Sequence, residues 1–322
     1  MTIPDEKFYR AQITRRIDFA PDLWMFRIRS GGEFKFVPGQ YATLGVEENG
    51  KRIERPYSIA SSPAEDEVEF FFELVPEGAL TPLLHKMQVG DQLLMRKAPK
   101  GKFSLDTQNG RKNHLLISTV TGVAPFVSFV RTLHQQWQEG RFDGAHKLFL
   151  LNGASRPWEF GYLEELRTLA KSAAPWFTYV PTVSRPWDHE DWPGEIGRAD
   201  DVLRKYADQW GLDGTNAMAY LCGHPEMIEH SKAILKRRGF TDKGVIKEEV
   251  YWVPATRQNL RAPGAPTLSQ LKAEAAASAP EQANAFHCER LACSVFRGRE
   301  ENQDGQFFRN LVELVFHFCG HK

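Results

Sequence analysis

The spacing of apolar residues changes along this chain near residue 113. Upstream, short apolar or alternating runs such as "YATLGV" and "VEFFFELV" are separated by turn signals such as "VPGQ" and "EENGK". Short, regularly spaced strands are typical of an antiparallel barrel or sandwich. Downstream, "HLLIS", "KLFLLNGAS" and "AMAYLCG" each precede a helical pattern, and this alternation predicts a parallel sheet with right-handed crossovers. The sequence therefore indicates a β-domain, with one short helix over Leu80–Met87, followed by an α/β domain.

Composition and charge argue against several classes of protein. The 322 residues include 41 basic and 41 acidic side chains, so the formal net charge is zero, which disfavours broad binding to nucleic acid or to an anionic membrane. The first residues lack the apolar core of a secretory signal, and no apolar run is long enough to span a membrane. Four cysteines are too few for a disulfide scaffold, so we expect a cytoplasmic location.

Residues 253–322 differ in composition from the rest of the chain. Their first half is rich in Ala, Pro, Ser and Gln and has few aromatic residues, which is typical of a linker or a disordered segment. We expect a largely disordered tail, with partial helical order as the alternative. No metal site is predicted, because the loose Cys/His set in the tail has the spacing of no known zinc finger: His287, Cys288, Cys293, His317, Cys319 and His321.

The stretch "HLLISTVTGVAPFVSFVRTL" has the pattern of a strand, a tight turn and a helix. Such a turn often holds a phosphate, because a helix N-terminus offers free N–H groups and a positive dipole end. Gly122 suits this role, whereas Val120, two residues earlier, is a poor residue for positive φ. We therefore predict that Val120 has a negative φ, and that a phosphate held by this turn would rest on Thr121, Gly122 and the helix N–H groups. By itself, the pattern fits a plain strand–helix turn equally well.

Three further stretches combine residues with binding or redox chemistry. In "RPYSIASSP", Arg55 can clamp a diphosphate, Tyr57 can stack on a ring, and Ser58 offers a hydroxyl; an ordinary hairpin strand is the alternative. "LCGHPEMI" places Cys222 at the carboxyl end of a predicted parallel strand, where α/β sheets bind ligands, although buried cysteines are often structural. "KEEVYW" sets an acidic pair before two aromatic residues, and a packed edge strand would give the same pattern.

Taken in order, these four stretches resemble the ferredoxin–NADP(+) reductase family of FAD flavoenzymes, over about Phe8–Trp252. "RPYS" is similar to the family's Arg-x-Tyr-Ser flavin motif, and "TVTGVAPF" to its Gly-Thr-Gly-x-Ala-Pro turn, in which glycine usually occupies the Val120 position. "LCGHPEMI" is similar to its Cys-Gly-x-Pro-x-Met motif, and "EVYW" to its Glu-x-aromatic terminus. The resemblance implies a β + α/β fold: a six-stranded antiparallel FAD-binding barrel over residues 1–108 and a five-stranded parallel NADP-binding domain over 109–252.

The resemblance also implies roles for individual residues. Hydride would pass between nicotinamide C4 and flavin N5, where Ser58 can hydrogen-bond N5, Cys222 packs against the nicotinamide, and Glu249 relays protons or positions that ring. Tyr251 would stack on the flavin face opposite Tyr57 and move aside for nicotinamide. The implied FAD-binding set is Arg55, Pro56, Tyr57, Ser58, Thr81, Tyr251 and Trp252.

The resemblance extends to coenzyme choice and partners. A 2′-phosphate needs cationic partners, and Arg156, Arg185 and Arg198 stand in or beside the family's NADP-binding segments, so we expect NADPH to be preferred over NADH. Solvated surface arginines are the alternative. The reduced flavin would then pass single electrons to a transiently bound ferredoxin or flavodoxin, and we expect a monomer or a weak dimer.

Two other functions remain open from the sequence. One is the reductase component of an oxygenase system; these often carry a Cys-x4-Cys-x2-Cys iron–sulfur motif, but Phe296 stands where the third cysteine would follow Cys293. The other is a non-catalytic FAD-binding redox sensor, which the valine at position 120 would favour if it impairs hydride delivery.

Overall fold

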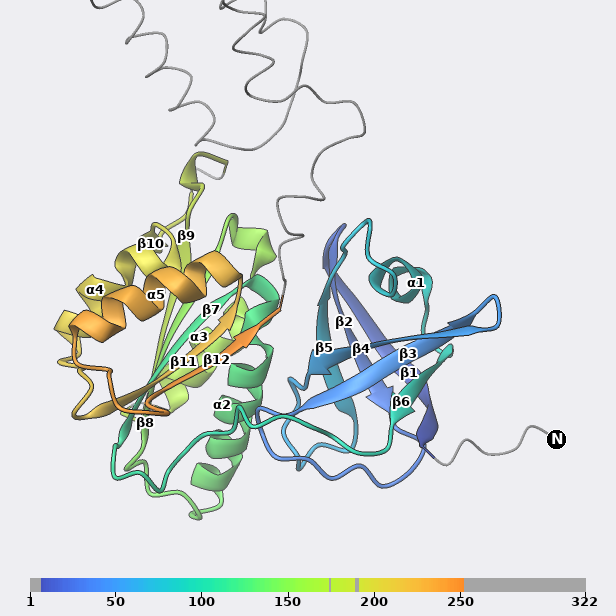
Figure 1. Cartoon of the computed structure of the whole chain (residues 1–322), viewed down its shortest axis with the longest axis horizontal. Coiled ribbons are helices and arrows are strands. Elements are labelled where there is room, and N and C mark those ends of the chain that lie inside the picture. The colour runs from blue at the N-terminus through green and yellow to red at the C-terminus, as the bar shows by residue number, and fades with distance from the viewer. Residues whose placement is uncertain (1–6, 174, 189–190, 252–322) are drawn as a thin grey trace, which may run out of the picture. The chain divides into compact units, whose positions relative to one another are not determined.

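The structure is a computed structural model that describes residues 7–173, 175–188 and 191–251. Predictions about Trp252 and about residues 253–322 fall outside the described residues. In the described part, a first sheet ends at Arg96 and a second begins at Asn113 (Figure 1). The change in apolar spacing near residue 113 therefore coincides with the change from one sheet to the other.

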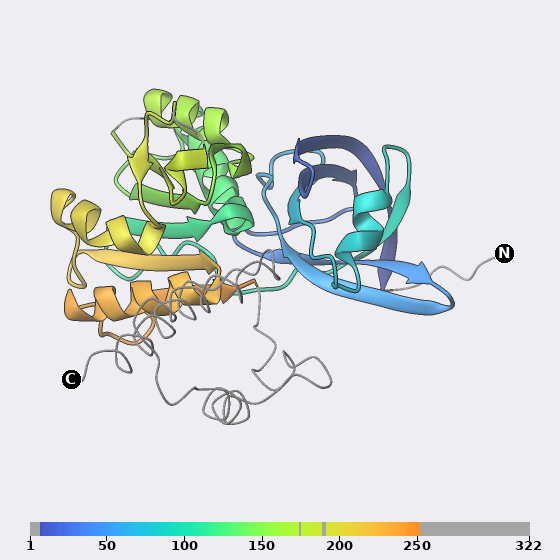
Figure 2. The ribbon, with the colours of Figure 1, turned by 90° about the horizontal axis from the view of Figure 1, so that it is seen from above.

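The first sheet is antiparallel, and its six strands have the spatial order β4-β3-β6-β1-β2-β5. A bridge between Ile59, just after β4, and Phe70 of β5 joins the two outer strands. The sheet thus curls into the predicted barrel, with the short helix α1 beside it (Figure 2). Its elements are β1 (Phe8–Ala20), β2 (Leu23–Arg29), β3 (Tyr41–Glu48), β4 (Lys51–Ser58), β5 (Val68–Glu73), α1 (Thr81–Lys86) and β6 (Gln92–Arg96).

Both faces of the β2–β5 pair are apolar, because each face packs on a different core. Trp24 and Phe26 of β2 face the barrel interior, where the Trp24 ring stacks on Phe72 of β5 with centroids 5.3 Å apart. Successive side chains of a strand point to opposite faces, so Met25 and Phe71 point outward. Both join the core of the α/β part. The continuous apolar run "VEFFFELV" therefore marks the side of the barrel that is covered by the second sheet's helices and loops.

The second sheet is wholly parallel, with the order β10-β9-β8-β7-β11-β12. Five strands match the prediction, and β10 adds two residues at one edge. The strands are β7 (Asn113–Thr119), β8 (Lys147–Ala154), β9 (Phe177–Val183), β10 (Glu195–Ile196), β11 (Ala217–Gly223) and β12 (Ile246–Val250). The helices are α2 (Ala124–Gln138), α3 (Leu163–Ser172), α4 (Ala199–Gln209) and α5 (Pro225–Arg237), with 3-10 turns η1 (Val120–Val123), η2 (Pro157–Glu159) and η3 (Pro186–Asp188).

The strand order reverses at β7, which lies between β8 and β11. Open α/β sheets bind ligands outside the carboxyl ends of the strands at such a switch point. The turn η1 follows β7 at this point, and α2 starts directly after it. Among the described residues, no helix is long and apolar enough to cross a membrane.

Candidate active site

The barrel side of the site is the end of β4, where four predicted residues stand in succession. Arg55 and Pro56 are exposed, Tyr57 is partly buried and Ser58 is buried. One guanidinium nitrogen of Arg55 donates to the backbone carbonyl of Glu54 at 2.7 Å, which leaves its other N–H groups for a diphosphate. The edge of Tyr57 packs against Phe72 with centroids 4.8 Å apart. Burial raises the Tyr57 pKa, so its ring is a neutral surface for stacking. The exposed cation of Arg55, the flat ring of Tyr57 and the hydroxyl of Ser58 suit the diphosphate, the flavin ring and the flavin edge of FAD, respectively.

Thr81 starts α1, as predicted, but its hydroxyl already has partners in the structure. It accepts from the Val75 backbone N–H at 3.0 Å and donates to the Val75 carbonyl at 3.1 Å. The turn is tight because a Cβ on Gly78 would lie 2.9 Å from that same carbonyl. The predicted bond from Thr81 to a pyrophosphate would therefore have to exchange with the bonds to Val75.

The turn after β7 is held in place by a close approach of two backbones. A Cβ on Gly122 would lie 2.3 Å from the carbonyl oxygen of Cys222, so only glycine fits. Thr119 binds the same neighbouring loop, because its hydroxyl accepts from the His224 backbone N–H at 2.9 Å. Gly122 and Thr121 are buried in this turn. The lack of a side chain at Gly122 thus brings the predicted phosphate turn against the end of β11.

The prediction of a negative φ at Val120 was wrong. Its φ is 42°, in the left-handed region that a β-branched residue rarely adopts. The path from β7 into α2 sets this backbone conformation, which glycine would adopt without strain. The valine is accommodated because its side chain packs against the small apolar cluster of Ala154, Phe160 and Val183. Apolar burial therefore offsets the conformational strain at this position.

The residues predicted to act in hydride transfer meet at the carboxyl ends of β11 and β12. Ser58 Oγ donates to Glu249 Oε2 at 3.1 Å, although the two residues are 191 positions apart. Cys222 lies opposite Glu249 in the register of the two strands. Tyr251 is 39% exposed, and its side chain reaches Cys222 and Ser58. The four predicted catalytic residues are therefore brought together in one place.

Two groups at this point have strongly shifted pKa values. Burial raises the pKa of Glu249 from 4.5 to about 7, and the hydrogen bond from Ser58 only partly opposes the shift. Burial, together with the nearby Glu249 charge, raises the pKa of the Cys222 thiol well above its usual value. A carboxyl with this pKa can exchange a proton near neutral pH, whereas the raised thiol pKa disfavours the nucleophilic thiolate form of Cys222.

The three arginines predicted for a 2′-phosphate line one edge of the second sheet. Ala154, Val183 and Ile196 are register partners across β8, β9 and β10, and an arginine stands two residues after each of them. Two of the arginines form ion pairs with carboxylates. Arg156 lies 2.7 Å from Asp188 and 3.4 Å from Glu159. Arg198 lies 3.2 Å from Glu226 and 3.3 Å from Asp200. Within the part of the chain that the structure describes, Arg185 forms no side-chain ion pair.

Sequence reasoning missed a polar cluster where the barrel meets α2 and α3. Its centre is Glu69, a fully buried carboxylate on β5 that is bound by Arg27, Arg131 and Tyr162. A signal was present, because Glu69 is an acidic residue inside the apolar run "VEFFFELV" and Arg131 is a lone cation in "APFVSFVRTL". Buried charges require partners, so the two isolated charges could have been paired from sequence.

A barrel that ends in Arg55, Tyr57 and Ser58, next to a parallel sheet with a tight glycine turn at its switch point, has the architecture of a flavin- and nicotinamide-dependent oxidoreductase. The comparisons with known proteins agree. Residues 10–105 match the family model of the oxidoreductase FAD-binding domain, and residues 116–233 match that of the oxidoreductase NAD-binding domain. The chain is 30% identical to a ferredoxin–NADP reductase from Pseudomonas aeruginosa over 230 residues, which cover 67% of this chain and 84% of the relative.

The chain belongs to the ferredoxin–NADP(+) reductase family, whose members carry out FAD-dependent, NADP(H)-linked electron transfer.

Other matches show the breadth of this family. A crystal structure of a ferredoxin NADP+ reductase from Neisseria gonorrhoeae with bound FAD and NADP superposes with a TM-score of 0.66 at 26% identity, covering 77% of this chain and all of that one. The reductase component of a phenol 2-monooxygenase from a Pseudomonas species is 29% identical, over 76% of this chain and 65% of the relative. The predicted fold class and the predicted cofactors, FAD and NADP(H), are thereby confirmed.

Substituting Glu249 tests its raised pKa. A carboxyl whose pKa is about 7 when folded and 4.5 when unfolded binds more protons in the folded state between these values, so it lowers the unfolding free energy as pH rises through that window. Relative to the wild type, Glu249→Gln should therefore gain stability between pH 5 and pH 8, as measured by urea unfolding. Glu248→Gln, at an exposed neighbour paired with Lys232, is the control. A Glu249→Gln difference that does not vary with pH would contradict the assignment.

Two substitutions at Val120 test its positive φ. Glycine relieves the left-handed strain and alanine does not, so Val120→Gly should be more stable to urea than Val120→Ala by about 0.5–1 kcal/mol. The order should reverse at Val127 inside α2, where glycine costs about 1 kcal/mol relative to alanine. If alanine is the more stable residue at both positions, Val120 does not hold a positive φ in solution.

Proposed function

We propose that the protein is an NADPH-preferring ferredoxin/flavodoxin–NADP(+) reductase of the bacterial type, which acts in the cytoplasm as a monomer or a weak dimer. The observation that carries this proposal is the meeting of Ser58 from the barrel with Glu249, Cys222 and Tyr251 from the α/β part. The flavin motif and the nicotinamide motif lie far apart in sequence, and a direct reaction between their ligands requires them to share one site.

Binding of the two cofactors divides between the two sheets. Arg55 would hold the FAD diphosphate, Tyr57 would stack on the flavin, and Ser58 would hydrogen-bond its N5 edge. On the other sheet, Thr121 and Gly122 would support the NADP(H) pyrophosphate at the start of α2. When bound, FAD supplies an acceptor for the nicotinamide hydride and the ability to release the two electrons one at a time.

The chain's own residues then orient the reactants and manage protons. Cys222 is fully buried and stays protonated, so it offers the nicotinamide a shaped apolar contact. Glu249 has a pKa of about 7, so its carboxyl can hold a proton or release it close to neutrality. Through Ser58, 3.1 Å away, that proton has a short hydrogen-bonded path toward the flavin edge. Tyr251 is partly exposed. This exposure suits a side chain that would move aside to admit nicotinamide.

Three aligned arginines at the edge of β8, β9 and β10 support a preference for NADPH. A 2′-phosphate bound there would meet Arg185 directly, and it would compete with Asp188 for Arg156 and with Glu226 for Arg198. A 2′-phosphate carries more negative charge than a carboxylate and can accept charge-assisted hydrogen bonds from several arginines at once. It can therefore replace carboxylate partners that are themselves partly exposed, such as Asp188 and Glu226.

Anaerobic mixing tests the reductase function. The purified flavin-loaded protein should be reduced by NADPH within seconds, and it should then reduce ferredoxin or flavodoxin in a coupled cytochrome c assay. Both activities follow from the shared site, because the nicotinamide and the flavin meet there. A flavin that remains oxidised under these conditions would contradict the proposal and favour a redox sensor.

Arg185 provides the test of coenzyme preference. Loss of one charge-assisted bond to the 2′-phosphate should lower kcat/KM for NADPH in Arg185→Gln by about tenfold or more, while kcat/KM for NADH stays the same. The matched control is Arg204→Gln, an arginine on α4 whose side chain is 83% exposed and lies 3.9 Å from Asp208. Equal wild-type rates with both coenzymes, or an equal loss with both in the variant, would refute the NADPH assignment.

The second candidate is the reductase component of an oxygenase system, favoured by the 29% identity to the phenol 2-monooxygenase reductase component. The chain covers 65% of that relative's length, and Cys293 is not followed by the third cysteine of an iron–sulfur motif. The acceptor separates the two functions, because an oxygenase reductase would reduce its oxygenase partner faster than it reduces free ferredoxin or flavodoxin.

A further inference from the structure

One face of α2 is hydrogen-bonded to the barrel segment that continues directly from Ser58. Residues 128, 131 and 132 have the i, i+3, i+4 spacing that places side chains on one side of a helix. Their bonds run to three consecutive residues, 60 to 62. Ser128 Oγ donates to the Ser61 carbonyl at 2.7 Å, Thr132 Oγ1 to Ser62 Oγ at 3.1 Å, and Arg131 Nη1 to the Ala60 carbonyl at 3.5 Å.

The same face of α2 binds the buried carboxylate of the barrel. Glu69 is fully buried; it forms an ion pair with Arg131, whose Nη2 lies 3.1 Å away, and accepts a hydrogen bond from the Tyr162 hydroxyl at 2.8 Å, and both partners lie in the α/β part. It also accepts from Arg27 Nε at 2.8 Å, on the neighbouring strand of the barrel itself. Burial and the Glu69 charge raise the pKa of the Tyr162 hydroxyl, so this hydroxyl remains a donor. Glu69 thus has one arginine partner from each part of the fold.

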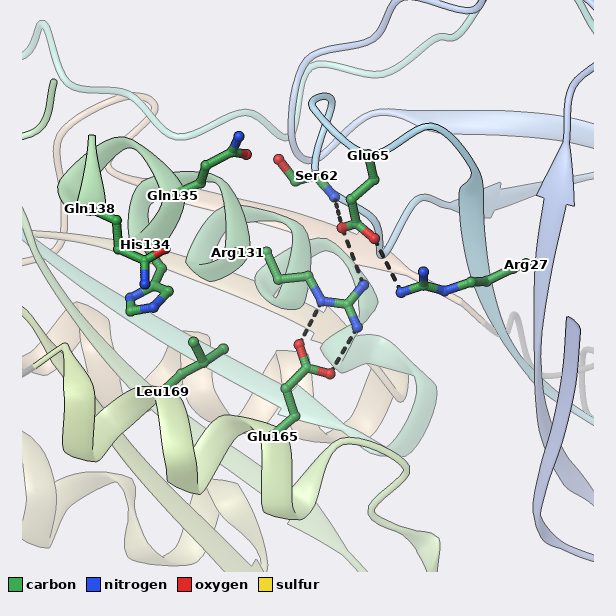
Figure 3. A pocket seen from close by; sticks show the side chains of 9 residues that line it. All are labelled: Arg27, Ser62, Glu65, Arg131, His134, Gln135, Gln138, Glu165 and Leu169. Atoms are coloured by element: carbon green, nitrogen blue, oxygen red, sulfur yellow. Dashed lines mark hydrogen bonds and ion pairs between the residues drawn. The ribbon is translucent and has the colours of Figure 1, made fainter. Parts of the chain in front are cut away.

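An open pocket of about 370 Å³ lies over this junction (Figure 3). In it, the Arg131 guanidinium points between two carboxylates, Glu165 of α3 and Glu65 of the barrel. The bonds to Glu165 are bidentate, at 2.6 and 2.8 Å, and Glu65 lies 3.5 Å away. Arg27 is also paired with Glu65, at 3.2 Å. The cations that line the pocket are therefore satisfied by the protein, so this pocket is a structural junction and not an anion site.

We propose that Arg131 is a positioning residue for hydride transfer, because it ties the helix that begins at the nucleotide turn to β5 and to the barrel segment that directly follows the flavin residues of β4. The proposal rests on the reductase function proposed above. Residues 120–123 lie immediately before α2, and Ser58 lies two residues before Ala60. The residues that would hold the nicotinamide nucleotide and the flavin thus lie only a few positions along the chain from this junction. Reaction rates are sensitive to such placement, since a 1 Å error can cost about 100-fold.

The chain offers a matched pair of variants, because Arg27 and Arg131 bind the same carboxylate. Arg131→Gln removes an arginine contact to Glu69 that joins the two parts of the fold, and Arg27→Gln removes the arginine contact to Glu69 within the barrel. In stopped-flow mixing of the flavin-loaded full chain, Arg131→Gln should slow flavin reduction at saturating NADPH by at least about tenfold. Its NADP+ dissociation constant, from the flavin difference spectrum, should change less than about twofold. Arg27→Gln should keep the wild-type rate although both variants lower Tm, and Arg131→Lys should recover part of the rate.

Hydrogen exchange supplies a readout that does not depend on turnover. Arg131→Gln should raise amide exchange both in residues 59–62 and in 128–132, whereas Arg27→Gln should raise it only in the barrel. If Arg131→Gln fails to retain flavin, Ser128→Ala replaces it, with Ser172→Ala as the control because that hydroxyl binds only its own helix, at Leu169. A wild-type reduction rate in the junction variant, or equal slowing by Arg27→Gln, would overturn the inference. A wild-type protein that NADPH does not reduce would instead overturn the proposed function.

Discussion

The buried carboxylate of Glu69 is the constraint on which the arrangement of the two domains depends. A buried charge is tolerated only when it is paired and hydrogen-bonded, and removing a partner costs about 3–5 kcal/mol. Two of its partners, Arg131 and Tyr162, come from the α/β part of the chain. Separation of the barrel from α2 would leave this charge with Arg27 alone. The apolar side chains of Met25 and Phe71 add burial at the same boundary.

The functional site follows from this junction and from the geometry of parallel strands. The carboxyl ends of β7, β11 and β12 lie together, so the turn with Gly122, the thiol of Cys222 and the carboxyl of Glu249 share one edge. The barrel brings Ser58 to that edge, 3.1 Å from Glu249. Burial by both parts of the fold then raises the Glu249 pKa to about 7. The raised pKa of Glu249 is thus a product of burial in the folded chain and is not intrinsic to the motif.

Apolar periodicity, a local property of the chain, predicted a β-domain followed by an α/β domain. That residues of the four motifs meet in one site was implied by their resemblance to the reductase family. Prediction from the sequence failed at Val120, where the turn imposes a φ of 42° that residue preference alone opposes. It also did not show that Arg156 and Arg198 are paired with carboxylates, because Asp188 and Glu226 approach them only in the folded chain. The Glu69 cluster was missed for the same reason, although an isolated charge in each of two apolar segments was a visible signal.

The central claim is that groups from the two domains act as one site, and a double-mutant cycle tests it most directly. The rate of flavin reduction by NADPH would be measured for the wild type, Ser58→Ala, Glu249→Gln and the double variant. Residues in contact show coupling energies of about 0.5–3 kcal/mol, whereas distant residues are additive within about 0.5 kcal/mol. We expect a coupling of at least about 1 kcal/mol. Additive effects of the two substitutions would contradict a shared site.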